Sequence, residues 1–209
     1  TWRIVRARPV ATAQTPARAP AAPLPAQPAA EIIVTASKRY TPLPRYAGMV
    51  EAIDANLFSS GEASGGTATL LARVASLSST HAGNGRNKLF IRAIADSGVA
   101  GPTQATTGQY LGDMRLNYAA PDPDLKLYDV GRVEILEGPQ GTLYGAGSLG
   151  GIIRIMPNAP NLGEFGGQVS AGLSATQHGA PGGDLSATIN LPIMPEKIAL
   201  RVVGYGVQE

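Results

Sequence analysis

Three glycines in "GPQGTLYGAGSLGGIIRI", residues 138–155, have the spacing of a loop that binds a phosphate group. Gly145, Gly147 and Gly150 form the pattern G-x-G-x-x-G, whose backbone amides cradle a dinucleotide pyrophosphate when a helix begins directly after the loop. Here the residues that follow are β-branched and run into Pro157, which predicts a strand instead of a helix. Without a helix N-terminus the loop lacks the dipole end that favours a phosphate. We therefore interpret the glycines as structural, because they allow tight turns and positive φ angles.

The composition argues against most other chemical sites. The chain has no cysteine, so it offers no disulfide, no thiolate metal site and no cysteine nucleophile. His81 and His178 lie in Gly-rich polar stretches, which favours loop residues over metal ligands or catalytic bases. The formal net charge of +2 is too small to indicate a nucleic-acid partner, and no run of about 18 apolar residues indicates a transmembrane helix. We expect no cofactor, no metal and no enzymatic activity.

Short strands and one main helix are expected to position the glycine loop. Segment 48–63 predicts a short strand and a turn of helix, and segment 67–79 predicts a longer helix with Thr67 as its N-cap. The apolar stripe of this helix consists of Leu70, Leu71, Val74 and Leu77. Further strands are expected at residues 88–94, 108–116, 129–138 and 150–157. This mixture of a helix and short strands predicts a small α+β domain.

The first 40 residues change in character twice. Residues 1–10 read as the tail of an upstream segment, and residues 11–30 are an Ala/Pro-rich stretch that predicts a semi-extended linker. The run "EIIVTA", residues 31–36, then supplies three consecutive β-branched residues. Two interpretations remain open at this point: an ordinary first strand, or a strand on a leash that adds to the edge of another protein's sheet.

From residue 166 the pattern alternates with period two. Val169, Ala171 and Leu173 alternate with small polar residues, and a second such run follows the turn "HGAPGG". A third strand begins at "IALRVVGYGV". Strands of about ten residues with one apolar and one small-polar face are typical of outer-membrane barrel walls, although a soluble sandwich produces the same alternation.

Three of these stretches resemble a known family, the TonB-dependent outer-membrane receptors. "EIIVTASKR" resembles the TonB box, "LFIRA" resembles a strand of the plug domain, and "DVGRVEILEGPQGTLYGAGSLGGIIRIMPNAP" closely resembles the plug's most specific segment. "TWRIV" before the linker is similar to the end of a periplasmic signalling domain. The sequence departs from the family pattern at Ala93, where glycine is preferred, at residues 108–116, and at the end of the helix, which lacks a Pro-Gly pair.

The resemblance implies an organisation and a mechanism. Residues 1–10 would be the tail of an upstream segment or signalling domain, 11–30 a linker, 31–39 the TonB box, 40–160 an α+β plug of short mixed strands with one or two helices, and 161–209 the first antiparallel strands of an outer-membrane β-barrel. The receptor would take up a scarce ligand such as an iron–siderophore complex, without chemistry. Ligand binding would release the box to the periplasm, where TonB, energised by ExbB and ExbD, would bind it. The residues assigned to TonB binding are Glu31, Ile32, Ile33, Val34, Thr35 and Ala36.

Two further sets of residues follow from this interpretation. The loops at 80–86, 96–108 and 117–124 are expected to face outward. The side chains expected to contact a ligand there are Arg86, Gln104, Tyr110 and Tyr118. A charged set on adjacent plug strands is expected either to seat the plug by ion pairing or to be solvated: Arg92, Arg132, Glu134 and Glu137.

Two alternatives remain. Closing a barrel of about 22 strands requires several hundred more residues, and this chain has room for about three strands, so we expect a piece of a longer receptor. The second possibility is a soluble plug-like module in the periplasm that binds a ligand or partner without transport. A parent reading frame with several hundred barrel residues would distinguish the two.

Overall fold

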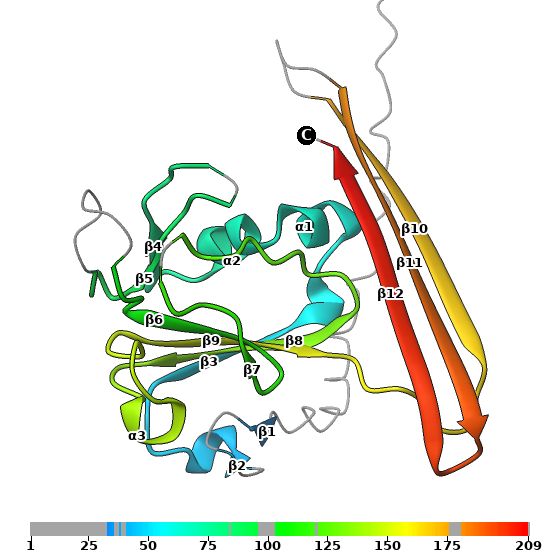
Figure 1. The fold of residues 1–209 in the computed structure, drawn as a ribbon, viewed down its shortest axis with the longest axis horizontal. Coiled ribbons are helices and arrows are strands. Elements are labelled where there is room, and N and C mark those ends of the chain that lie inside the picture. Colours follow the sequence, from blue (N-terminus) through cyan, green and yellow to red (C-terminus); the bar gives the residue numbers. More distant parts are fainter. Residues whose placement is uncertain are drawn as a thin grey trace, which may run out of the picture. The chain divides into compact units, whose positions relative to one another are not determined.

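The computed structural model describes residues 33–35, 38, 41–83, 85–95, 103–119, 121–175 and 181–208. Within these ranges the chain forms one five-stranded sheet, one three-stranded sheet and two small two-stranded pairs (Figure 1). Residues 1–30, with the expected upstream tail and linker, lie outside the described residues.

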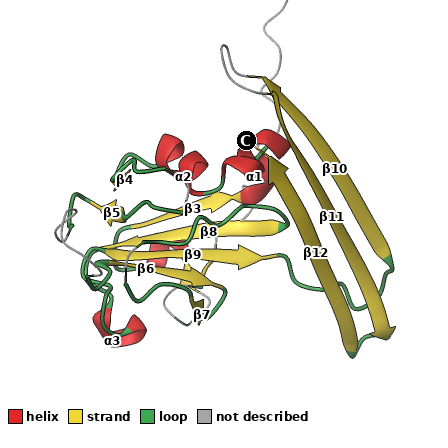
Figure 2. Cartoon of the chain, turned by 45° about the horizontal axis from the view of Figure 1, so that its top comes forward, coloured by secondary structure: helices red, strands yellow, loops and turns green. Residues whose placement is uncertain are grey.

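The five-stranded sheet, here called the central sheet, has the order β3-β8-β9-β6-β7. Its pairs are antiparallel except for β6 with β9, which run parallel. The segments expected at 129–138 and 150–157 are strands of this sheet, β8 and β9 (Figure 2). The segment 108–116 was expected to be one strand and is instead a hairpin of two, β6 and β7, because the chain turns at Gly112 and Asp113. The strands are β3 Val50–Asp54, β6 Thr107–Leu111, β7 Met114–Arg115, β8 Val130–Glu137 and β9 Gly151–Pro157.

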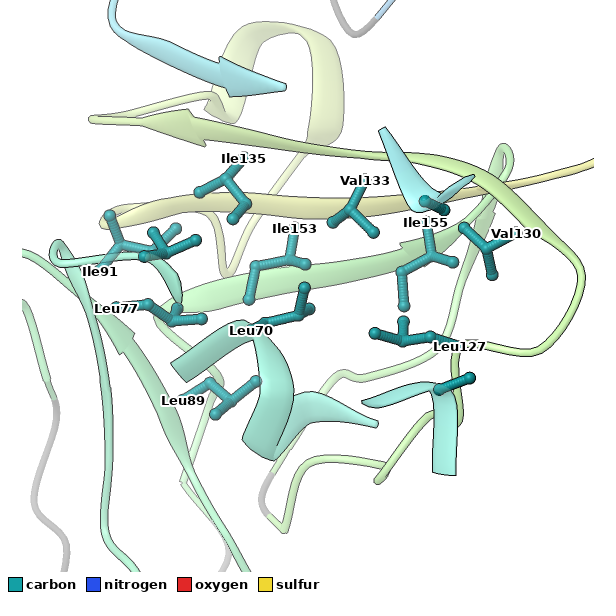
Figure 3. Packing of buried hydrophobic residues seen from close by; sticks show 13 residues of the cluster. Leu70, Leu77, Leu89, Ile91, Leu127, Val130, Val133, Ile135, Ile153 and Ile155 are labelled. Carbon is teal, nitrogen blue, oxygen red and sulfur yellow. The ribbon is translucent and has the colours of Figure 1, made fainter. Parts of the chain in front are cut away.

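One face of the central sheet carries the main hydrophobic core. Val133 and Ile135 of β8 and Ile153 and Ile155 of β9 are at most 2% exposed and pack on the same side, because side chains alternate at period two. Figure 3 shows Leu70 lying against this row. Burying one such side chain contributes about 1.5–3 kcal/mol, so this face supplies much of the domain's stability.

Two short α-helices lie in the chain between β3 and the other four strands of the central sheet. α1, Ser60–Gly65, begins with a capping box in which Ser59 and Glu62 satisfy each other's backbone amides. α2, Thr67–Arg73, follows after Gly66, which has a positive φ of 57°. The remaining short elements are η1 Leu43–Arg45, η2 Ala55–Leu57, α3 Gly141–Tyr144, β4 Leu77–Ser79 and β5 Leu89–Ile91.

The prediction for segment 67–79 was wrong in its length and in its cap. The helix ends at Arg73, Val74 is extended, and Leu77 belongs to β4, which pairs with β5. Thr67 is the first helical residue and Gly66 occupies the N-cap position. The apolar stripe is nevertheless largely buried, because both the helix and the extended segment after it belong to the main core. Leu71 is the exception, since it is only half-buried.

The three-stranded sheet consists of β10 Gly166–Ala175, β11 Pro181–Met194 and β12 Ile198–Gln208, in that order and antiparallel. Its two faces differ as the alternation predicts. Leu173 is 98% exposed and Val169 73% exposed, whereas Ser186 and Asn190 on the other face are buried. The apolar face of this sheet is therefore uncovered within the described chain.

Candidate functional site

Two residues of the segment expected to bind TonB form a strand that is paired within the chain. β1, Ile33–Val34, pairs antiparallel with β2, Thr41–Pro42. The side chain of Val34 is fully buried in a second hydrophobic cluster, on the face of the central sheet opposite to the main core. Its buried neighbours there are Tyr110, Leu136, Tyr144 and Ile152. Glu31, Ile32 and Ala36, the other predicted residues, lie outside the described residues.

Thr35 is bound by charged side chains of the central sheet. Its backbone amide donates to Glu134 Oε1 at 2.9 Å, and its hydroxyl lies 3.1 Å from the same oxygen. The hydroxyl oxygen in turn accepts hydrogen bonds from Arg132 Nη2 at 3.0 Å and Arg154 Nη1 at 2.8 Å. A single threonine thus connects a buried carboxylate with two guanidinium groups.

The charges around Thr35 neutralise one another at close range. Glu134 is fully buried, and Arg132 Nε donates to it at 2.8 Å. Arg154, which is 4% exposed, lies 3.6 Å from Glu134 and also donates to Asp113 at 2.8 Å. Lys38 donates to the same Asp113 oxygen at 2.6 Å. We call this set the latch: Thr35, Lys38, Asp113, Arg132, Glu134 and Arg154.

Several titrating groups in this region have displaced pKa values, among them Asp113 and Tyr144. The hydrogen bond from Lys38 holds the pKa of Asp113 below its ordinary value, against a small effect of burial and with help from Arg154. Burial raises the pKa of Tyr144 to about 12. At neutral pH Asp113 is therefore an anion and Tyr144 a neutral phenol, so the ion pairs of Asp113 with Lys38 and Arg154 are formed.

The predicted plug-seating charges separate into two places. Arg132 and Glu134 belong to the latch, and Arg92 and Glu137 form a looser pair at 3.7 Å. Burial rules out the solvated alternative for Glu134, whereas the side chain of Arg92 is 58% exposed. The ion pairs found for these four residues in the described chain are with residues of the central region, and none joins them to β10, β11 or β12.

A different pair of residues joins the central region to the three-stranded sheet. Asp129 accepts two hydrogen bonds from Arg201 of β12, both at 2.6 Å, and a third from Asn158 at 2.9 Å. The neighbouring Tyr128 donates to Asp184 of β11 at 3.1 Å, and its ring lies 5.0 Å from that of Tyr205.

Sequence reasoning missed this contact, although the sequence contains a signal for it. Asp184 lies on the small-polar face of β11, where the alternation otherwise places glycine, serine, threonine and asparagine. Arg201 lies on the same face of the sheet in β12, where the other residues are alanine, valine and tyrosine. A charge at such a position requires a partner of opposite sign or a hydroxyl donor. The partner's identity could not be read from the sequence, because Asp129 is 72 residues from Arg201.

The residues predicted to contact a ligand occupy two different environments. Arg86, Gln104 and Tyr118 are exposed, and the ring of Tyr118 lies 4.7 Å from the Arg115 guanidinium. Tyr110 is in strand β6 and only 4% exposed, and its hydroxyl donates to the carbonyl of Tyr144 at 2.9 Å. The expectation that Tyr110 presents its ring outward was wrong, because that ring packs beside Val34 in the second cluster. Residues 96–102 of the predicted loops lie outside the described residues.

The glycine loop binds a side chain of the same chain. Arg115 donates to the carbonyl of Ala146 and, through Nε, to the carbonyl of Asn117 at 2.6 Å. A Cβ atom added at Gly147, whose φ is +78°, would collide with the Arg115 guanidinium. The loop therefore turns a carbonyl oxygen toward a cation, the opposite polarity to a phosphate-binding loop, and β9 follows it as predicted.

Other kinds of site receive no support from the described ranges. No group of three or more His, Asp or Glu side chains converges there in a way that could hold a metal ion. None of the helices described is long and apolar enough to cross a membrane.

Comparison with known proteins identifies the family to which this chain belongs. The family described as TonB-dependent receptor plug domain matches residues 45–152, more than half of the 209 residues. A variant of the ferric enterobactin receptor PfeA from Pseudomonas aeruginosa is similar over 76% of this chain and 24% of its own, with a TM-score of 0.57 and 19% identity. The siderophore receptor PirA from Acinetobacter baumannii has the same coverage, a TM-score of 0.58 and 14% identity.

A third solved structure, the ferric-catecholate import receptor Fiu from E. coli, covers 81% of this chain with 22% of its own length, a TM-score of 0.56 and 15% identity. At these identities the likeness shows the fold. The predicted fold class, an α+β plug followed by the first antiparallel barrel strands, is thereby confirmed. The chain spans about a quarter of the length of these receptors.

Proposed function

We propose that this chain, which belongs to the TonB-dependent receptor plug domain family, is the plug and first barrel strands of an outer-membrane receptor for energised ligand uptake. The family consists of receptors and transporters rather than enzymes. The expected division at residues 31–39, 40–160 and 161–209 into box, plug and barrel strands is part of this proposal.

The latch is the observation that carries the proposal. A TonB box must be held while no ligand is bound and released afterwards, and Thr35 is held by hydrogen bonds from and to charged groups. Each such bond contributes about 1.5–3 kcal/mol, and burial of Val34 adds a similar amount. These contacts are few and all lie within two residues of the chain, so they can be lost together without unfolding the central sheet.

A ligand releases the box only if it binds the released state more tightly. Changing the ratio of held to released box from 99:1 to 1:99 requires a difference in ligand affinity of about 10⁴-fold, or about 5.5 kcal/mol. A 99:1 ratio by itself corresponds to about 2.7 kcal/mol of net holding free energy, half of that change. The charged hydrogen bonds of Thr35 and the buried Val34 are together at least of this size, so they can keep the box held without ligand. A ligand opens the latch when its preference for the released state exceeds this holding free energy.

The released segment, residues 31–36, would add as a strand to a sheet edge of TonB, which ExbB and ExbD energise. Backbone hydrogen bonds supply most of the affinity in such strand addition, so β-forming residues such as Ile33 and Val34 suit the role. Among the described residues β1 pairs with two residues, and one of them, Pro42, has no amide to donate. A pairing that lacks this donor is easily exchanged.

The ligand would be met at the opposite loops. Arg86, Gln104 and Tyr118 remain the candidate contacts, because they are exposed on loops rich in small polar residues. Arg86 suits an anionic chelate, and Tyr118 offers an aromatic face with a hydroxyl. The solved receptors named above are described as receptors for ferric enterobactin, siderophores or ferric catecholates, which supports an iron chelate as the ligand class.

The outer membrane is the proposed location, with the plug and box facing the periplasm. The uncovered apolar face of β10–β12, with Leu173, Val169 and Leu185 more than half exposed, suits contact with lipid. The opposite face carries Asp184 and Arg201, which bind the plug residues Tyr128 and Asp129.

Replacing Ile33 with proline in the parent receptor tests the proposal. Proline removes an amide donor and fixes φ, which blocks strand addition. Uptake of the iron chelate should collapse while its binding to whole cells persists. Ala30→Pro, in the Pro-rich linker next to the box, is the matched control and should leave uptake unchanged. Survival of uptake in Ile33→Pro would reduce residues 31–36 to a structural strand, and failure of the chelate to bind cells at all would favour the soluble module.

A further inference from the structure

The hairpin formed by β6 and β7 connects the loop end of the domain with the latch. Its turn consists of Gly112 and Asp113, and its arms pair at Tyr110 with Arg115 and at Leu111 with Met114. The two arms continue to pair beyond the strands, through the Ala105 amide and the Tyr118 carbonyl at 3.2 Å and a bridge between Gln104 and Ala119. The hairpin therefore extends from residue 104 through its turn to residue 119.

The turn of this hairpin is bound by the latch. Arg154 donates through Nε to the carbonyl of Gly112 at 2.8 Å and through Nη2 to Asp113 at 2.8 Å, while its Nη1 donates to Thr35. Lys38, three residues beyond Thr35, donates to the same Asp113. Any displacement of the turn consequently moves the guanidinium that holds Thr35, because one planar group makes all three contacts.

The middle of the hairpin touches the box in a second way. The ring of Tyr110 is part of the cluster that buries Val34, and it is fixed by its hydrogen bond to Tyr144 and by an edge-to-face contact at 4.9 Å. The same hairpin therefore contributes both the apolar surface against Val34 and, through Asp113, the charge that positions Arg154.

The opposite end of the hairpin carries the candidate ligand contacts. Gln104 and Tyr118 lie on the two arms near the loop end, and both are exposed. Between the ends, Asn117 locks the arms together, since its side chain accepts from the Gln109 amide at 2.8 Å and donates to the Thr107 carbonyl at 2.9 Å. Asn117, Gln109 and Thr107 are at most 2% exposed, so the arms are expected to move as one body.

We propose that the β6–β7 hairpin transmits ligand binding at Gln104 and Tyr118 to the box, and that Asp113 at its turn is the positioning residue through which Arg154 holds Thr35. This inference rests on the proposed function, which identifies one end of the hairpin as a ligand site and the segment at the other end as the TonB box. The coupling itself can be tested with neither ligand nor TonB present. It requires that a constraint at the loop end of the hairpin changes the hydrogen-exchange protection of the Thr35 amide.

The experiment uses the absence of cysteine from the chain. Gln104 and Ala119 are bridge partners and both exposed, so a pair of cysteines at these positions can form a disulfide that ties the loop ends of the arms. Hydrogen exchange of the Thr35 amide is measured in the full chain with the disulfide oxidised and then reduced. Exchange of the Ile153 amide in the core strand β9 reports any global change in stability.

The effect of oxidation on Thr35 exchange is compared between the chain with Asp113 and the Asp113→Asn variant. With Asp113 present, oxidation should slow exchange at Thr35 by about three- to tenfold, the size expected for a modest coupling, and leave Ile153 unaffected. In Asp113→Asn the effect of oxidation on Thr35 should become clearly smaller, because only the Gly112 carbonyl and the Tyr110 ring still connect the hairpin to the box. In Asp113→Glu it should return at least in part. Glu51→Gln, a carboxylate-to-amide change on strand β3 at the other edge of the central sheet, is the matched control and should keep the full effect.

Two results would overturn the proposal. One is an oxidation effect at Thr35 of equal size with and without the Asp113 carboxylate, and the other is no effect in either background. Because no ligand or TonB takes part, these results would leave the proposed uptake function untouched. Conversely, loss of uptake in the proline variant says nothing about the hairpin.

Discussion

The two faces of the central sheet are made by alternate residues of the same strands, but they bury different kinds of side chain. Toward the main core, Val133, Ile135, Ile153 and Ile155 meet apolar side chains. On the other face the same strands present Glu134 and Arg154, and both bind Thr35 of the box. Apolar contacts are non-directional and add over a large area, whereas a few charged hydrogen bonds form and break as a set. The face toward the main core, here called the permanent face, is suited to keeping the domain folded, and the other face is suited to releasing the box.

The largest effect is expected on the permanent face. Leu70→Ala removes a fully buried side chain of the main core and should lower the free energy of unfolding by about 2–5 kcal/mol. Leu71→Ala, one residue further along the same helix, is the control, and its cost should be clearly smaller because Leu71 is half-buried. Urea denaturation of both variants decides this, and equal losses would mean that α2 is buried on both sides.

A smaller and local effect is expected at the latch. Thr35→Val removes the hydroxyl that accepts from Arg132 and Arg154, leaving two guanidinium donors without that acceptor. The box should be released more readily by about 1–3 kcal/mol, which corresponds to about 5- to 150-fold faster trypsin cleavage after Lys38. Thr142→Val, at an exposed position of α3, is the control and should leave cleavage unchanged. Unchanged cleavage after Lys38 in Thr35→Val would show that the hydroxyl does not hold the box, and that Val34, the Thr35 amide and Lys38 do.

The two faces should also respond differently to acid. Asp113 has a lowered pKa in the folded chain, so its contribution is fully present above its unfolded pKa of about 3.9 and is lost as the pH falls through the lower folded value. Protection of the Thr35 amide, corrected for intrinsic exchange, should hold from about pH 7 to pH 5 and decline below about pH 4. Asp113→Asn should remove that decline. A matching decline at Ile153 would instead indicate global acid unfolding.

The smallest effect on the free energy of unfolding is expected at Ala93, where the backbone is strained. Ala93 has a φ of +57° in the turn after β5, a conformation that glycine adopts without a steric penalty. Ala93→Gly should raise the free energy of unfolding by about 0.5–1 kcal/mol, after allowing for the greater entropy of unfolded glycine. Ala52→Gly, in the extended strand β3, should lower it. Thermal unfolding of the two variants gives the sign directly.

Much of the fold could be predicted because side-chain periodicity is local. The alternation at 129–138 correctly placed Val133 and Ile135 on one face, and the β-branched run after Gly150 correctly excluded a phosphate-binding helix. The candidate site was only partly accessible in this way. The run at 31–36 indicated a strand that could be exchanged, but nothing in it indicated that Thr35 would meet Glu134, 99 residues away.

The sequence by itself determined which residues share a face, since a period of two is fixed by the geometry of an extended backbone. The tertiary structure alone decided what covers each face. It buried Tyr110 beside Val34, ended α2 at Arg73 so that Leu77 could pair in a sheet, and brought Asp129 to Arg201. These outcomes depend on contacts between distant segments, whose free energies compete with local preference and, at these positions, exceed it.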